Sequence, residues 1–202
     1  RDGSWGPAID PIHWDKTIAG VGLARSFARA YLEANPGVEI GFIPAACGGS
    51  PVECWVPGAY FEGTKSFPYD DAIARTRVVA TRGALKGVLW HQGEADSRPG
   101  RVEFYHGRLV DLFERLRRDL GNPDLPILVG QLGRFPGADW SPERENVDSI
   151  HQLIAVSDSR VGFVSSDGLS SKEDLLHFDA TGLDEFGRRY AAAWERLISG
   201  SP

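Results

Sequence analysis

The chain has 202 residues, a formal net charge of -6 and a hydrophobic fraction of 42%, values that suit one soluble globular domain over residues 1–202. No Lys/Arg-rich run or basic stripe occurs, so nucleic acid and anionic membranes are poor candidate partners. No apolar run is long enough to span a bilayer. Cys47 and Cys54 do not form a disulfide framework, and their spacing leaves a local disulfide undecided.

Short apolar runs alternate with longer amphipathic segments along the chain. Such alternation is typical of an α/β protein whose parallel sheet is covered on both faces. In chain order, the patterns predict a helix over 17–35, a strand over 38–44, a helix from about 69, a strand over 85–90, a helix over 101–120, a strand from 126, a helix over 142–157, a strand over 160–166 and a helix from 179.

The segments that follow the four predicted strands are rich in Gly, polar and aromatic residues: AACGGSPVECW, HQGEADSRPG, GRFPGADW and SDGLSSKEDLLHFD. Ligands of parallel α/β sheets collect beyond the carboxyl ends of the strands. We therefore expect one cleft built from all four segments.

The stretch DLLHFD places Asp174 three residues ahead of His177. A neutral imidazole can take a proton from a hydroxyl, and a carboxylate on its other nitrogen fixes the tautomer. Isolated pairs with this spacing are usually surface or capping residues, so the pair needs further support. Asp179, followed by Ala-Thr-Gly, is predicted to be an ordinary helix N-cap.

The stretch WHQGEAD puts a Gln and two carboxylates at the end of a predicted buried strand. The side-chain N–H of Gln92 could donate to a developing oxyanion. Glu94 and Asp96 fit three roles: general acid and base, metal ligands, or acceptors that tie loops together, and the last role alone is as well supported as the first two combined. Gly48, Gly49 and Ser50 form a third element, in which glycines let a backbone N–H approach a ligand closely.

Taken together, these segments resemble the SGNH hydrolase superfamily, and more narrowly the carbohydrate esterases typified by sialate O-acetylesterases and acetylxylan esterases of family 6. The matching pieces are DPIHWDKTIAGVGLARSFA, IPAACGGSPVECW, GVLWHQGEAD and DLLHFDATGLDEFGRRYAAAW. They span most of the chain in the expected order.

The resemblance implies a flavodoxin-like three-layer α/β/α sandwich with strand order 2-1-3-4-5. It also implies His177 as the general base and Asp174 as its orienter. The oxyanion donors would be the backbone of Gly48 and Gly49 together with Gln92, with Glu94 as a supporting polar residue. The implied activity is O-deacetylation of an acetylated carbohydrate without a cofactor, in an extracellular or periplasmic setting.

One family feature is absent from the sequence. The nucleophilic Ser of the family lies in a Gly-Gln-Ser-Asn segment after the first, central strand, and no such segment occurs in the chain. We expect an N-terminally truncated esterase that lacks this strand and is unstable or rearranged alone. The alternatives are an in-chain substitute (Ser50, Ser4 or Ser165) and a non-catalytic carbohydrate-binding or scaffold protein of the same fold, which binds acylated sugars without cleaving them or has some other role.

Aromatic residues are candidate platforms for a sugar ring. Trp55 and Tyr60 are the candidates that we retain, Trp140 is a weaker one, and Trp90 is better explained as a core residue. A third function class is a metal-assisted hydrolase that uses His91, Glu94, Asp96, Asp174 and His177. Their spacing matches no recognised metal-binding motif, so we expect no metal.

Overall fold

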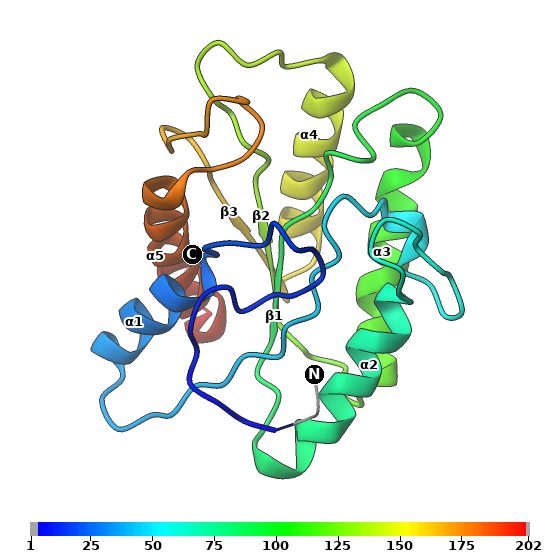
Figure 1. Cartoon of the computed structure of the whole chain (residues 1–202). Helices are drawn as coiled ribbons and strands as arrows, with labels where there is room; N and C mark the ends of the chain where they lie inside the picture. The colour runs from blue at the N-terminus through cyan, green and yellow to red at the C-terminus, as the bar shows by residue number, and fades with distance from the viewer. Residues whose placement is uncertain (1–3, 201–202) are drawn as a thin grey trace.

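The computed structural model describes residues 4–200, which form a three-stranded parallel sheet between two layers of helices (Figure 1). The α-helices are α1 (Ala24–Ala34), α2 (Pro68–Val79), α3 (Val102–Asp119), α4 (Pro142–Ser157) and α5 (Ala180–Ser199), and the strands are β1 (Val88–Trp90), β2 (Ile127–Gly130) and β3 (Val161–Val164). Two 3₁₀ turns, η1 (Val52–Cys54) and η2 (Ala80–Arg82), complete the elements. The architecture is the flavodoxin-like α/β fold that the resemblance implied.

The sheet has the order β1-β2-β3 with every pair parallel. In register, Val88 lies beside Ile127, and Ile127 lies beside Val161. β2 is fully buried along its length, as expected for a central strand covered on both faces. Because the strands are parallel, the loops that follow them gather at one end of the molecule, at the top of Figure 1.

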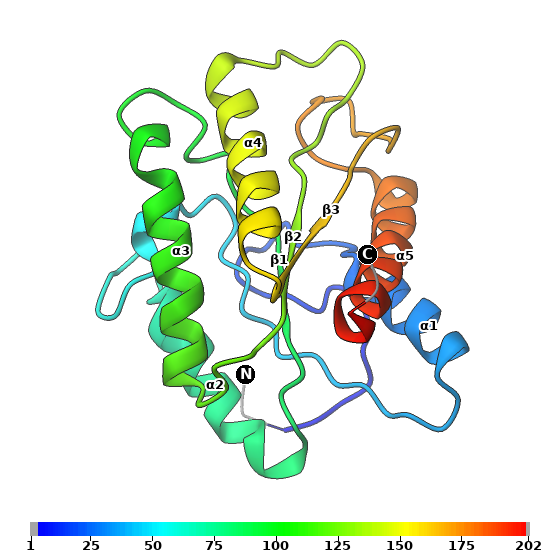
Figure 2. The same cartoon turned by 180° about the vertical axis from the view of Figure 1, so that it is seen from behind.

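Helices α1 and α5 cover one face of the sheet, whereas α3 and α4 cover the other, with α2 beside α3 (Figure 2). The apolar stripe predicted for α3 is buried, and its residues are Tyr105, Leu109, Leu112, Phe113 and Leu116. Helix α5 begins where the sequence predicted, because the Asp179 carboxylate accepts a hydrogen bond from the Gly182 N–H at 2.7 Å. Among the described residues, no helix is long and apolar enough to cross a membrane.

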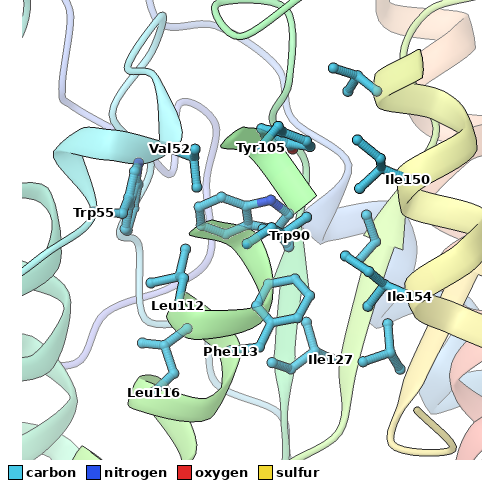
Figure 3. Close-up of a cluster of buried hydrophobic side chains, with 14 of the residues drawn as sticks. Val52, Trp55, Trp90, Tyr105, Leu112, Phe113, Leu116, Ile127, Ile150 and Ile154 are labelled. Atoms are coloured by element: carbon cyan, nitrogen blue, oxygen red, sulfur yellow. The ribbon is translucent and has the colours of Figure 1, made fainter. Parts of the chain in front are cut away.

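Trp90 lies at the centre of the core between β1, α3 and α4 (Figure 3). Its ring makes edge contacts with Trp55 and Phe113, at centroid distances of 4.9 and 6.2 Å. Edge-to-face aromatic pairs of this kind add to the free energy gained by burying their area. Trp90 therefore anchors the C-terminal end of β1, directly before the polar loop that begins at His91.

Two predicted elements differ from the structure. Residues 38–44 form no strand, because no described strand pairs with them: the Val38 N–H only closes a turn onto Asn35 O, and Val38 is 45% exposed. Ile40 and Phe42 still pack against the α1–α5 side of the core. The first helix begins at Ala24 and not at residue 17, after a stretch in which Gly20 and Gly22 oppose helix formation.

Candidate active site

Asp174 and His177 form the pair that their spacing predicted. His177 Nδ1 lies 2.7 Å from Asp174 Oδ2, so the carboxylate can hold the proton on Nδ1 and leave Nε2 free to accept one. The imidazole is 66% exposed and is therefore open to solvent and to a substrate. The pKa of Asp174 is held well below its usual range, first by the backbone N–H of His177 and then by its imidazole and the N–H of Leu176.

The backbone between β3 and α5 produces this pairing locally. Asp174 Oδ1 accepts hydrogen bonds from the N–H groups of Leu176 and His177, both at 2.9 Å. The Lys172 N–H donates to His177 O at 2.8 Å and closes the loop. Leu175 has a φ of 51°, a left-handed conformation that costs free energy for a branched residue. The two bonds to Asp174 Oδ1 help to hold that conformation.

The Gly48–Ser50 turn presents backbone donors near this end of the sheet. The Gly48 N–H donates to Asp15 Oδ2 at 2.7 Å. Gly49 is exposed, has a φ of 80°, and its N–H has no hydrogen-bond partner among the described residues. The left-handed conformation explains the need for glycine at this position. The Gly49 N–H is thus free to bind an anion, whereas the Gly48 N–H already binds one, the Asp15 carboxylate.

Gln92 connects this turn to the loop after β1. Its Nε2 donates to Ser50 O at 3.1 Å and to Asp96 Oδ2 at 2.5 Å. Asp96 is completely buried and also accepts from the Val52 N–H, and burial raises the pKa of its carboxyl group. Asp96 therefore has the loop-tying role that the sequence left open for it, and both amide hydrogens of Gln92 have acceptors.

Two residues that the sequence analysis did not assign to the site contact Gln92 or its partner. The Tyr105 hydroxyl lies 3.1 Å from Gln92 Oε1 and 2.8 Å from His151 Nε2. Both side chains are completely buried. The sequence contained one indication of these residues: a Tyr and a His lie on the apolar faces of two helices. Polar groups of side chains that are buried in a core need hydrogen-bond partners.

The other predicted site residues lie in different surroundings. Trp55 is 6% exposed, and its Nε1 donates to Ser50 Oγ, which places it in the core and not on the sugar-binding surface that we expected. Tyr60 is exposed and pairs with Phe67. Glu94 is half-buried in the loop after β1.

Ser50, Ser165 and His91 have contacts of their own outside the Asp174–His177 pair. The Ser50 hydroxyl is buried and donates to Cys47 O, and the Ser165 hydroxyl donates to Gln131 Oε1. His91 Nε2 lies 3.1 Å from Gln131 O, and the His91 ring packs against the Phe178 ring with a centroid distance of 5.6 Å. Within residues 4–200, no three His, Cys, Asp or Glu side chains are grouped as metal ligands.

The contact between His91 and Phe178 joins the two halves of the candidate site. His91 precedes Gln92, and Phe178 follows His177, so the donors and the Asp–His pair share one end of the sheet. In the described part of the chain, no direct hydrogen bond joins His177 to Gln92. The candidate site thus consists of the Asp174–His177 pair and a separate group of hydrogen-bond donors.

Comparisons with known proteins identify relatives of the whole chain. The chain is 30% identical over 199 residues to a protein named probable carbohydrate esterase At4g34215 from Arabidopsis thaliana, covering 94% of this chain and 70% of the relative. The X-ray structure of that Arabidopsis protein superposes with a TM-score of 0.82 and 28% identity, covering 95% of this chain and 76% of the other.

Two more distant structures share the fold. XAC1771, a carbohydrate acetylesterase from Xanthomonas citri, has a TM-score of 0.70 at 21% identity over 89% of this chain and 41% of its own. NanS has a TM-score of 0.68 at 19% identity over 90% and 72%. Residues 1–196 match the family described as carbohydrate esterase, sialic acid-specific acetylesterase, and the chain belongs to this family.

Proposed function

We propose that this chain carries the acid–base half of a serine-type carbohydrate O-acetylesterase, with His177 as general base and Asp174 as its orienter. The observation that carries the proposal is the 2.7 Å contact between His177 Nδ1 and Asp174 Oδ2, which leaves the exposed Nε2 as a proton acceptor. Membership of a carbohydrate esterase family supports an acetylated sugar as the substrate.

The proposed reaction is acyl transfer in two steps. A serine hydroxyl attacks the acetyl carbonyl carbon while His177 Nε2 takes its proton, and the carbonyl oxygen becomes an oxyanion. When the intermediate collapses, the C–O bond to the sugar breaks and His177 returns the proton to the departing sugar oxygen. Water, activated by the same imidazole, then releases acetate from the serine. No cofactor takes part.

The oxyanion is assigned to the Gly48–Ser50 turn and Gln92. The Gly49 N–H is the donor that is free among the described residues, whereas the Gly48 N–H must exchange Asp15 for the oxyanion. Gln92 must likewise redirect one N–H, or act by holding the turn through Ser50 O. Removing one donor of this kind costs about 10²–10³-fold in kcat.

The nucleophile is proposed to be a serine that these 202 residues do not contain. No Gly-Gln-Ser-Asn motif occurs in the sequence, and the hydroxyls of Ser50 and Ser165 are bound elsewhere. The unpaired extended segment 38–44 and the edge strand β1 support the proposal, since a further parallel strand would have backbone partners there.

The test measures acetate release from p-nitrophenyl acetate and acetylated xylan. It compares this chain, a version extended by a segment with the Gly-Gln-Ser-Asn motif, and His177→Ala in both. His106→Ala, which changes an exposed histidine on α3, is the matched control. We expect turnover only by the extended version, abolished by His177→Ala and unaffected by His106→Ala.

Other outcomes identify other functions. Turnover by the 202-residue chain that depends on His177 would place the nucleophile within it and overturn the assignment of an outside serine. Binding of acetylated xylan without turnover by either version would replace the esterase with a non-catalytic carbohydrate-binding protein.

A further inference from the structure

A buried chain of hydrogen bonds runs from helix α4 to the Gly48–Ser50 turn. His151, on α4, contacts the hydroxyl of Tyr105, on α3, at 2.8 Å. That hydroxyl lies 3.1 Å from Gln92 Oε1, and Gln92 Nε2 lies 3.1 Å from Ser50 O. The chain of bonds therefore links four segments, namely α4, α3, the loop after β1 and the Gly48–Ser50 turn, and ends at the proposed oxyanion donors.

The donor and acceptor roles along this chain follow from the contacts of the Gln92 amide. Gln92 Nε2 faces two oxygens, Ser50 O and Asp96 Oδ2, so the amide nitrogen must point to them and Oε1 must point to Tyr105. Oε1 needs a donor, which only the Tyr105 hydroxyl supplies among its described contacts, and the same hydroxyl also lies 3.1 Å from the backbone Gln92 O. The Tyr105 oxygen then accepts from His151 Nε2–H.

The protonation states agree with these roles. Burial lowers the pKa of His151 to about 3, with His91 adding to the effect, so the imidazole is neutral at neutral pH. Burial also raises the pKa of Tyr105 well above its usual value, so the hydroxyl keeps its proton. The result is a neutral relay in which the single Tyr105 hydroxyl proton faces two oxygens of Gln92, Oε1 and the backbone O.

Burying the polar groups of this relay costs free energy that apolar side chains at the same positions would not cost. Tyr105 and His151 are completely buried, and His151 Nδ1 has no hydrogen-bond partner within residues 4–200. Phenylalanine and leucine would fill the same space without that loss. We therefore attribute the presence of these polar groups to their effect on Gln92: they hold its side-chain amide in one orientation.

We propose that Tyr105 and His151 are positioning residues of the acetylesterase site: their relay fixes the Gln92 amide, which in turn holds the Gly48–Ser50 turn in its donor geometry. This inference rests on the proposed function for its kinetic consequence. Its structural consequence, an immobilised Gln92 amide, does not depend on turnover.

The kinetic test uses Tyr105→Phe in the version of the protein that hydrolyses acetyl esters. We expect kcat to fall by about tenfold, as for a slightly misplaced catalytic group, with KM changed less than about twofold. Adding Tyr105→Phe to Gln92→Ala should produce little further loss, because the proposed effect of Tyr105 passes through Gln92 Oε1 and only its bond to the backbone Gln92 O remains in that background.

Tyr190→Phe is the matched control. Tyr190 is also completely buried, and its hydroxyl donates to Trp90 O at 2.9 Å on the other face of the sheet, without contact to Gln92. Equal losses of kcat in Tyr105→Phe and Tyr190→Phe would overturn the proposal, as would full additivity with Gln92→Ala.

Substitution of His151 provides a test if Tyr105→Phe does not fold. His151→Gln keeps an N–H that can donate to the Tyr105 oxygen, whereas His151→Leu removes it. We expect kcat close to that of the parent for His151→Gln and a clear loss for His151→Leu. Equal kcat values in the two variants would contradict a positioning role.

A second measurement separates failure of this inference from failure of the proposed function. In ¹⁵N-labelled 202-residue chain, the Gln92 side-chain amide hydrogens should exchange slowly with solvent, and His151 should show the Nε2–H tautomer. Tyr105→Phe should accelerate the Gln92 exchange, and Tyr190→Phe should not. If no version hydrolyses esters, this result still decides the relay, and unchanged Gln92 exchange in Tyr105→Phe would reject it.

Discussion

Asp174 uses its two carboxylate oxygens for different purposes. Oδ1 accepts the backbone N–H groups of Leu176 and His177, and Oδ2 faces the imidazole. In Asp174→Asn, the amide oxygen can keep the backbone bonds while the amide N–H₂ faces Nδ1, which favours the wrong tautomer. We expect kcat of the active version to fall by about 10³–10⁴-fold, the order seen for the equivalent change in a serine protease.

The control for this prediction is thermal unfolding. Because the loop bonds persist, Asp174→Asn should unfold within a few degrees of the parent. Retention of more than a tenth of the activity would show that Asp174 does not orient His177.

His151 gives a prediction about pH and stability. Its pKa is about 3 in the folded chain because of burial, against about 6.5 when unfolded. Between these values the unfolded state binds the additional proton, so the stabilisation is complete above pH 6.5 and decreases as the pH falls towards 3. Relative to His151→Gln, the parent should lose up to about 1.4 kcal/mol of unfolding free energy per pH unit.

Urea unfolding of both proteins at several pH values between 4 and 7.5 measures this difference. The comparison cancels the contributions of the buried carboxyls Asp96 and Asp148, whose raised pKa values act in the opposite direction. Parallel pH dependences for parent and variant would show that His151 protonates readily in the folded state.

The sequence could predict the pairing of Asp174 with His177 because a three-residue spacing brings them together within one loop. It could not predict the contacts of Gln92 with Tyr105, or of Gly48 with Asp15, which join residues 13 and 33 positions apart. Such contacts depend on how loops and helices pack. Trp55 shows the same limit, since its burial depends on Trp90 of another element.

Among the elements, the packing of α1 on α5 depends on Gly187. A Cβ at this position would overlap Ser26 Oγ and the backbone oxygen of Leu23. Because backbone cannot move aside as a flexible side chain can, Gly187→Ala should lower the unfolding free energy by about 1–3 kcal/mol.

Gly107→Ala on α3 is the matched control. No atom lies within 4 Å of the position that a Cβ would occupy at this helical glycine, so alanine should raise stability by about 0.5–1 kcal/mol through helix propensity. Chemical denaturation of both variants checks the signs. Equal effects would mean that α1 and α5 are not in close contact.

The predictability of the elements follows the same physics. Helices α3, α4 and α5 were placed to within a few residues, because amphipathic stripes, Ser141 and Asp179 mark them locally. Residues 38–44 have the composition of a strand, yet a strand also requires a neighbour. The apolar run alone could not show that none of the described backbone pairs with it.

At the scale of the whole molecule, the core consists of two clusters of buried side chains that meet at the sheet. The strands of this sheet do not all have the same number of hydrogen-bonded neighbours. β2 has a hydrogen-bonded strand on each side, whereas β1 has one only towards β2. Segment 38–44 contacts the core through Ile40 and Phe42. The side of the molecule next to β1 is therefore held by side-chain packing without backbone pairing among the described residues.

This asymmetry predicts the pattern of amide hydrogen exchange. Amides of β2 should be protected close to the global unfolding free energy, because exchange there requires the sheet to open. Amides of residues 39–43 should exchange within the shortest labelling time, since they have no backbone partners among the described residues.

In the version extended by the Gly-Gln-Ser-Asn segment, residues 39–43 and the free edge of β1 should both become protected, because a strand inserted between them would pair with each. Mass spectrometry of peptic peptides measures all three regions in one experiment. Protection of residues 39–43 in the 202-residue chain alone would mean that this segment already has a backbone partner, and unchanged exchange in the extended version would mean that the added segment does not enter the sheet.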